Sequence, residues 1–197
     1  MKNKTKKCIK ELKKLYPSMK YDVSHNKTKH NKYNTTYGEM EYEGIEKLYN
    51  HLLQTNKQIN CFMDLGSGRG KLCMYMSAQQ DIQKVIGIEL VKERHDDAIA
   101  MKNKLTEISD KVDLFNNDIF KISLIPYAKY NNFIWISSLC FSEKIVNNIF
   151  KKIKRELNTG TIVCCSKIPT IKIGELIDTV IIPQTWNSEH EVSIFRL

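Results

Sequence analysis

The sequence lacks a long hydrophobic run, an apolar leader and any paired-cysteine motif. No stretch approaches 18 consecutive apolar residues, so we expect no membrane-spanning helix. The first residues, MKNKTKKCIK, are not followed by an apolar segment, so we expect no secretory signal peptide. The six cysteines form no CxxC pair and the five histidines no HExxH motif. We therefore expect buried free thiols in a reducing, intracellular compartment, and no metal site.

The excess positive charge lies in one segment. The chain has 197 residues and a formal net charge of +9, and residues 1–36 hold eleven lysines against only Glu11 and Asp22. The rest of the chain is therefore balanced in charge. Helical spacing of Ile9, Leu12 and Leu15 stops before Pro17. We interpret residues 1–36 as a basic, partly disordered N-terminal arm, which is either a solvated tail or an electrostatic handle for DNA phosphates or another acidic surface.

Apolar runs and helical patterns alternate along the remaining sequence. Helices are predicted over residues 38–54, 69–80, 92–108 and 142–157, the last with Ser142 as its N-cap. Strands are predicted over residues 60–65, 84–90, 111–118, 132–139 and 160–167. Two final strands, 178–186 and 191–197, have no helix between them and should pair antiparallel. This pattern predicts an α/β fold, in which a mostly parallel sheet has helices on both faces and binds its ligand at the carboxyl ends of the strands.

A glycine-rich segment, FMDLGSGRGKL at residues 62–72, follows the first of these strands. Gly66, Gly68 and Gly70 allow a sharp turn and a close approach to a ligand, to which N–H groups at the start of the helix would be available. The spacing is GxGxG, and Lys71 stands where a dinucleotide loop would need its third glycine. A glycine-rich turn can also be no more than a tight connection between a strand and a helix. The residues at the ends of the other strands therefore indicate whether this turn binds a ligand.

Acidic residues end three successive predicted strands: Asp64, Glu89 and Asp118. Glu89 can accept hydrogen bonds from both hydroxyls of a ribose. Asp118 can bind an adenine amino group, with Ile119 or Phe120 against the ring. Because an acidic end of the first strand would repel a pyrophosphate, the pattern predicts a nucleoside site without a phosphate.

Four features of the sequence resemble the class I S-adenosylmethionine methyltransferases: the segments DLGSGRG, GIE and NND, and the final hairpin. The resemblance implies a seven-stranded Rossmann-like sheet with an antiparallel final hairpin, a domain over residues 37–197, and S-adenosylmethionine as cofactor with S-adenosylhomocysteine as product.

Three further segments resemble, in order and spacing, the disruptor-of-telomeric-silencing family: YGEMEYEGIEKL, IWISSLCFSEKIVNNIFKKIKREL and GTIVCCSK. That family methylates a lysine of nucleosomal core histone without a SET domain. It implies a histone or nucleosome as substrate, a location in the nucleus or on chromatin, and contact of the arm with DNA.

The resemblance also implies roles for single residues. In the family a Tyr-Gly-Glu segment, here residues 37–39, closes over the cofactor, and the acidic group matching Asp64 lies near the cationic amino end of its methionine moiety. The candidate cofactor-binding residues are Tyr37, Glu39, Asp64, Gly66, Ser67, Gly68, Lys71, Glu89, Asp118, Ile119 and Ser137. The candidate catalytic residues are Ser137, Phe141 and Tyr37.

Two positions depart from the family pattern. Met40 stands where the family commonly has Thr, whose hydroxyl serves the cofactor carboxylate. SSLCF at residues 137–141 matches the Asn-Asn-Phe-x-Phe signature that lines the acceptor-lysine channel, so Phe141 can form an apolar wall while Ser137 offers a single hydrogen bond. The segment has no Asn/Asp-Pro-Pro motif, which disfavours methylation of nucleic-acid bases. A class I enzyme for a non-histone protein or a small molecule, and a catalytically silent binding module, remain alternatives.

Overall fold

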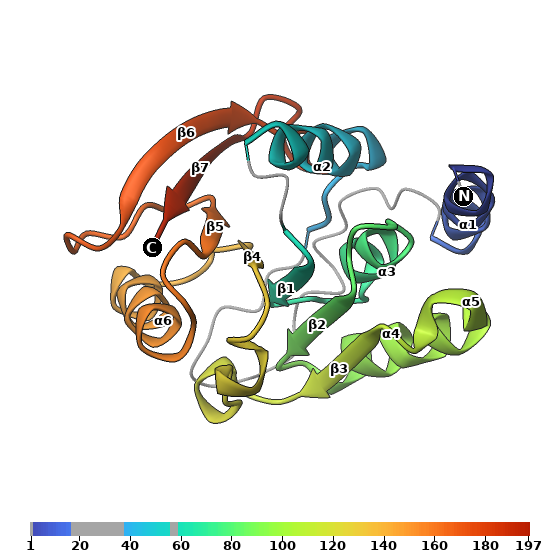
Figure 1. The fold of residues 1–197 in the computed structure, drawn as a ribbon, viewed down its shortest axis with the longest axis horizontal. Helices are drawn as coiled ribbons and strands as arrows, with labels where there is room; N and C mark the ends of the chain where they lie inside the picture. Colours follow the sequence, from blue (N-terminus) through green and yellow to red (C-terminus); the bar gives the residue numbers. More distant parts are fainter. Residues whose placement is uncertain (1, 17–37, 56–58) are drawn as a thin grey trace.

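The computed structural model describes residues 2–16, 38–55 and 59–197. Its centre is a seven-stranded sheet of order β3-β2-β1-β4-β5-β7-β6 (Figure 1). The strands are β1 (Cys61–Leu65), β2 (Lys84–Glu89), β3 (Val112–Asn116), β4 (Asn132–Ile136), β5 (Ile162–Cys165), β6 (Glu175–Ile181) and β7 (Glu191–Arg196). The helices are α1 (Lys2–Leu15), α2 (Tyr42–Thr55), α3 (Lys71–Ser77), α4 (Lys92–Lys104), α5 (Thr106–Ser109) and α6 (Glu143–Glu156), with 3-10 turns η2 (Ile119–Lys121) and η3 (Ile125–Tyr127).

The sheet is parallel from β3 to β5 and antiparallel at its other end. β1 pairs in parallel with β2 and β4, while β7 lies antiparallel between β5 and β6. This confirms the predicted α/β fold and its antiparallel final hairpin. Because β1 and β4 are neighbours whose crossovers leave in opposite directions, their carboxyl ends form the crevice in which such sheets bind ligands.

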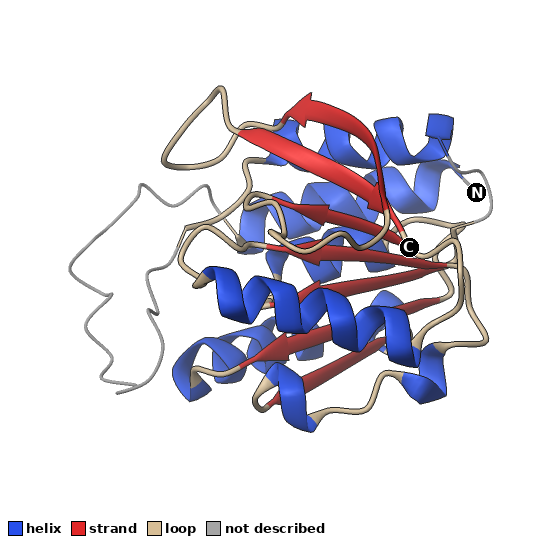
Figure 2. Ribbon diagram, turned by 90° about the vertical axis from the view of Figure 1, so that its left-hand side faces the viewer, coloured by secondary structure: helices blue, strands red, loops and turns tan. Residues whose placement is uncertain are grey.

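Helices cover both faces of the sheet (Figure 2). Alternate residues of β1 serve the two sides, since Phe62 packs in the core with α1, α2 and α3, and Met63 in the core with α6. Buried side chains of α6 recur every three to four residues: Val146, Ile149, Phe150 and Ile153. Ser142 caps α6 as predicted, its hydroxyl accepting a hydrogen bond from the Ile145 N–H. None of the six cysteines, all of which lie in the described residues, forms a disulfide, and all but Cys140 are buried.

Three predicted helices differ in extent from those observed, and the one expected over residues 69–80 is the shorter α3, Lys71–Ser77. The helix expected over residues 92–108 breaks at Leu105, whose backbone leaves helical geometry while its side chain stays buried, so α5 begins anew at Thr106. The helix expected from residue 38 begins only at Tyr42, because residues 38–41 are extended and bonded to the segment after β6. No helix in the described parts of the chain is long and apolar enough to cross a membrane.

Helix α1 packs against the domain through one face. Cys8, Leu12 and Tyr16 recur every four residues and are buried. The Tyr16 hydroxyl donates a 2.6 Å hydrogen bond to the Arg69 carbonyl in the glycine loop, and the Tyr42 hydroxyl donates to the carbonyls of Leu12 and Tyr16. The described part of the basic segment is therefore attached to the loop that follows β1.

Replacing Leu12 by Ala should destabilise the whole domain, because Leu12 is 1 % exposed within the shared core. Loss of a buried leucine costs about 2–5 kcal/mol in the free energy of unfolding. Urea unfolding measures this value, and Lys14→Ala on the exposed side of the same helix is the matched control, with a change of about 0.5 kcal/mol or less. Equal unfolding midpoints for both variants would contradict the docking of α1.

Candidate functional site

The loop between β1 and α3 depends on glycine. Gly66, Gly68 and Gly70 have φ angles of 99°, 53° and 78°. Residues that carry a side chain rarely adopt this left-handed region of backbone angles, so a substitution at any of the three glycines would strain the turn. A Cβ on Gly87 of the neighbouring strand would lie 2.7 Å from Leu114 Cδ2 and 2.9 Å from the Ser67 hydroxyl, so a larger residue there would require these side chains to move. The sequence correctly located a sharp turn after the first strand.

Most N–H groups of this loop are already bonded within the protein. Those of Gly66 and Ser67 both donate to the Ile88 carbonyl, at 2.8 and 3.0 Å. The Gly68 N–H donates to Glu89 Oε2 at 2.7 Å. These three loop amides are therefore engaged within the protein, because the end of β2 lies alongside the loop and accepts their hydrogen bonds. The expectation from the sequence concerned the N–H groups at the start of the helix, and it stays a prediction.

Glu89, the last residue of β2, is fixed by backbone hydrogen bonds on both carboxylate oxygens. Its Oε2 accepts the hydrogen bond from the Gly68 N–H, and its Oε1 accepts a hydrogen bond from the Val91 N–H at 2.8 Å. The side chain is 6 % exposed. A carboxylate has about four acceptor positions, so Glu89 can still accept from further donors.

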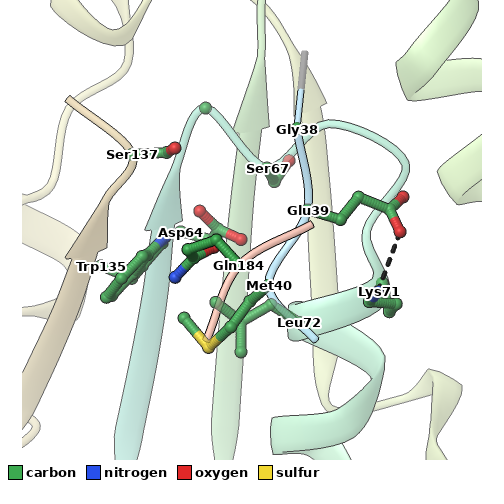
Figure 3. A pocket seen from close by; sticks show the side chains of 11 residues that line it. Gly38, Glu39, Met40, Asp64, Ser67, Lys71, Leu72, Trp135, Ser137 and Gln184 are labelled. Atoms are coloured by element: carbon green, nitrogen blue, oxygen red, sulfur yellow. Dashed lines mark ion pairs between the residues drawn. The ribbon is translucent and has the colours of Figure 1, made fainter. Parts of the chain in front are cut away.

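A cavity of about 40 Å³ that opens to solvent lies where β1 and β4 end (Figure 3). It unites segments from distant parts of the chain. Its lining residues are Gly38, Glu39, Met40, Asp64, Gly66, Ser67, Lys71, Leu72, Trp135, Ser137 and Gln184. The cavity thus brings together six of the expected site residues, while Gly68, Glu89, Asp118, Ile119 and Phe141 lie outside its lining. Tyr37 falls outside the described residues.

Asp64 is the charged group whose environment is most unusual. It is 3 % exposed, and its Oδ1 has no hydrogen-bond partner among the described residues. Burial and, second, the charge of Glu89 raise the pKa of Asp64 from 3.8 to about 8. A buried acceptor without a donor is costly, and such groups are found where a ligand supplies the partner.

Lys71 and Glu39 form a buried ion pair at the other side of the cavity. The Nζ to Oε2 distance is 2.9 Å, and the side chains are 4 % and 6 % exposed. The Lys71 ammonium also lies 5.0 Å from the centre of the Tyr42 ring. The two charges compensate each other, so this pair adds no net charge to the cavity.

The segment that carries Glu39 is held by the turn after β6. Met40 forms an antiparallel bridge with Gln184. The Glu39 N–H donates to Thr185 Oγ1 at 3.1 Å, and the Thr185 N–H donates to the Glu39 carbonyl at 2.9 Å. A Cβ on Gly38 would lie 2.2 Å from the Trp186 ring. Sequence reasoning missed this part of the site, since nothing in the local pattern links residues 38–41 to residues 183–186.

The SSLCF segment places its two serines differently. Ser137 lines the cavity, whereas Ser138 is fully buried and its hydroxyl accepts a 2.7 Å hydrogen bond from the Lys167 N–H. The segment then turns, the Phe141 N–H donating to the Ser138 carbonyl. The tip of the Phe141 ring lies 3.9 Å from the position of a Cβ on Gly66, beside the cavity.

Asp118 lies past the end of β3 and caps the following turn. Its Oδ1 accepts from the Phe120 N–H at 2.9 Å, and the Phe120 side chain is 39 % exposed. The Asn116 side chain donates to the Glu89 carbonyl at 3.0 Å, which joins the ends of β3 and β2. Asp64 and Glu89 therefore lie within the last two residues of β1 and β2, and Asp118 lies two residues beyond β3, so the three acidic residues mark the carboxyl ends of three adjacent strands.

No cluster of three or more His, Cys, Asp or Glu side chains in residues 2–16, 38–55 and 59–197 is placed to hold a metal ion. The titratable groups of the cavity are instead one unpartnered carboxylate and one compensated ion pair. This arrangement suits an organic ligand with a cationic group.

Several solved structures with a similar fold are described as methyltransferases. An RNA methyltransferase from Salinibacter ruber, in complex with S-adenosyl-L-homocysteine, is 15 % identical over 77 % of this chain and 90 % of its own, with a TM-score of 0.57. A candidate methyltransferase from Escherichia coli, yhhF, is 12 % identical over 79 % and 86 %, also with a TM-score of 0.57. A candidate S-adenosyl-L-methionine-dependent methyltransferase from Methanococcus maripaludis is 20 % identical over 62 % and 54 %, with a TM-score of 0.51. These similarities establish the class I methyltransferase fold.

The family follows from the sequence itself. No curated protein matches the chain significantly. The sequence model of the family described as histone methylation protein DOT1 matches residues 18–168. This range is more than half of the chain and contains the glycine loop, Asp64, Glu89 and the SSLCF segment. The protein therefore belongs to the DOT1 histone methylation family.

Proposed function

We propose that this protein is an S-adenosylmethionine-dependent protein-lysine N-methyltransferase that acts on nucleosomal core histone. The family match over residues 18–168 carries the proposal. The class I fold and a cavity at the ends of β1 and β4 support it, because this crevice is where open α/β sheets bind their ligands.

The described residues fit this cofactor. When bound, S-adenosylmethionine supplies an electrophilic methyl group on a positively charged sulfur. Asp64, buried and without a donor, would hold the ammonium of its amino-acid end. Glu89 would accept hydrogen bonds from the ribose hydroxyls, and Asp118 with Ile119 would contact the adenine. Gly66 and Gly68 lack side chains that would block a close approach.

The acceptor side would act by positioning and by exclusion of water. A lysine side chain has a reference pKa near 10.4 and must lose a proton before its amine can attack. Trp135, Leu139 and Phe141 offer apolar surface near Ser137, and burial against such walls, next to a cation, lowers the pKa of an amine. The Ser137 hydroxyl would orient the amine with one hydrogen bond. Tyr37 is expected to complete the wall, although it lies outside the described residues.

The exposed side of α1 would bind DNA phosphates of the nucleosome. Lys6, Lys10 and Lys14 point away from the buried face of this helix. Because α1 is docked through Leu12 and Tyr16, these charges are held at a defined place on the domain. Contacts of this kind supply salt-dependent affinity without sequence preference.

The serines at residues 137 and 138 favour a second candidate. Ser138 is engaged with Lys167 and Ser137 is shorter than Asn, so the acceptor side has fewer polar groups than the family signature provides. A class I methyltransferase acting on a non-histone protein or a small molecule would use the same cofactor cavity with a different acceptor.

Methyl incorporation from labelled S-adenosylmethionine into reconstituted nucleosomes should occur and should be lost in Asp64→Asn. The assay compares nucleosomes with free histones, naked DNA and a peptide mixture, because only the first presents histone and DNA together. Incorporation confined to peptides or metabolites would select the second candidate. Cofactor binding without turnover on any acceptor would indicate a silent binding module.

Cofactor affinity should rise as the pH increases from 6 to 8. The pKa of Asp64, raised to about 8, keeps this carboxyl protonated at pH 6, and binding an ammonium requires its ionised form. The apparent Kd for S-adenosylhomocysteine should therefore fall by up to about tenfold per pH unit, with release of a proton, as measured by isothermal titration calorimetry. Asp64→Asn should show no such dependence, and a flat profile for the unmodified protein would contradict this role.

The contribution of Asp64 to the stability of the unliganded protein should decrease as the pH rises, whereas the cofactor affinity should increase. A folded-state pKa above the unfolded value means that stability is greatest below about pH 4 for this group and declines as the pH rises towards 8. The ligand-induced shift in Tm should accordingly be larger at pH 8 than at pH 6.

Changing Lys6, Lys10 and Lys14 to Gln should reduce nucleosome affinity and its dependence on salt. Each lost phosphate contact lowers the slope of log affinity against log salt by about 0.9, so a decrease of about 2 to 3 is expected. The matched control changes Lys144, Lys151 and Lys154, three exposed lysines of α6 on the opposite face of the sheet. Equal slopes in the two triple variants would show that α1 is not the DNA-binding element.

A further inference from the structure

A second polar group in the cavity has no partner in the described structure. Gln184, in the turn after β6, is 4 % exposed, and its Nε2 makes no hydrogen bond to any described residue. Its side chain extends into the cavity next to Asp64 (Figure 3). One cavity thus contains an unpartnered acceptor, Asp64 Oδ1, and an unpartnered donor, Gln184 Nε2.

The position of Gln184 is fixed by its backbone. Its N–H donates to the Asn187 carbonyl at 3.0 Å, and its carbonyl accepts from the Asn187 N–H at 3.2 Å. The bridge with Met40 holds the other side of the residue. A buried amide donor without an acceptor costs free energy, and a rigid backbone prevents the side chain from escaping to water.

The other cationic or hydroxyl donors of the cavity have other surroundings. Lys71 is paired with Glu39 at 2.9 Å and lies against the Tyr42 ring. The Ser67 hydroxyl lies near Gly87, towards β2. Ser137, the remaining hydroxyl of the lining, follows β4 and is assigned to the acceptor side. Among these donors, Gln184 Nε2 is the one that lies next to Asp64 and has no partner among the described residues.

We propose that Gln184 donates to the α-carboxylate of the cofactor and that Gln184 and Asp64 together recognise its zwitterionic amino-acid end. This inference rests on the proposed cofactor. The ammonium of the zwitterion satisfies Asp64 and the carboxylate satisfies Gln184, so one ligand group removes both unpartnered atoms. Hydrogen bonds to ionised groups are the stronger kind.

The bridge between Met40 and Gln184 explains how this donor is placed. Met40 occupies the position at which the family commonly has a threonine hydroxyl for the cofactor carboxylate, and it offers no donor. Residues that face each other across an antiparallel bridge have Cβ atoms about 4.5–5.5 Å apart. The amide of Gln184 thus reaches the same region from the opposite segment, which makes residue 184 a determinant of cofactor specificity.

The test compares Gln184→Met with the unmodified protein on three ligands by isothermal titration calorimetry. S-adenosylhomocysteine carries the full amino-acid end, its decarboxylated analogue lacks the carboxylate, and 5′-methylthioadenosine lacks the whole end. Gln184→Met should weaken S-adenosylhomocysteine about 10- to 100-fold, as expected for a hydrogen bond to a charged group, and change the other two less than about twofold.

A double variant tests whether a hydrogen-bond donor at residue 40 can replace the donor at residue 184, on the other side of the bridge. Adding Met40→Thr to Gln184→Met should restore most of the affinity for S-adenosylhomocysteine, and circular dichroism should show both variants folded. Equal loss for all three ligands, or no loss for any, would overturn the role of Gln184. Failure of the unmodified protein to bind any of the three would instead overturn the proposed cofactor.

Discussion

The buried ion pair between Lys71 and Glu39 connects the parts of the molecule that form the site. Lys71 opens α3 directly after the glycine loop, and Glu39 lies on the extended segment that the turn after β6 holds in place. Tyr42, whose ring faces Lys71, bonds in turn to the end of α1. A buried pair of this kind contributes little net stability, but losing one partner leaves an uncompensated charge. The glycine loop, the segment over the cavity, the final hairpin and α1 therefore depend on one another for their positions.

Compensation of Lys71 by Glu39 determines the charge that the cavity presents to a ligand. Lys71 is not free to neutralise Asp64, whose carboxylate is left with the repulsion of Glu89 and the cost of burial, and its pKa rises accordingly. The same arrangement leaves Gln184 as a donor close to Asp64. The cavity is thus suited to a ligand that carries an ammonium and a carboxylate on one carbon atom, which is the chemistry of an amino-acid group.

The two halves of the proposed active site differ in how closely they follow the family pattern. The cofactor half retains its acidic strand ends and its glycines. In the acceptor half, Ser138 has become a structural residue that anchors the loop at Lys167, and Ser137 is the polar group left beside the cavity. Apolar surface from Trp135 and Phe141 remains. In the proposed function, a site of this composition would rely on desolvation and positioning of the acceptor, with a minimal contribution from hydrogen bonding.

The sequence by itself determined the parallel strands, the sharp glycine turn and the order of Asp64, Glu89 and Asp118, because apolar runs and glycine spacing are local properties of the chain. The strand predicted over residues 178–186 instead lies at Glu175–Ile181. Local pattern also predicted the α6 cap at Ser142. Only the tertiary structure decided that residues 38–41 are extended, that loop amides bond to the end of β2, and that Gln184 enters the cavity. Glu39 and Thr185 are 146 positions apart, and pairing over that distance depends on how the whole sheet brings its two ends together. No local periodicity predicts such a contact, so the position of the Gln184 donor opposite Met40 follows only from the folded structure.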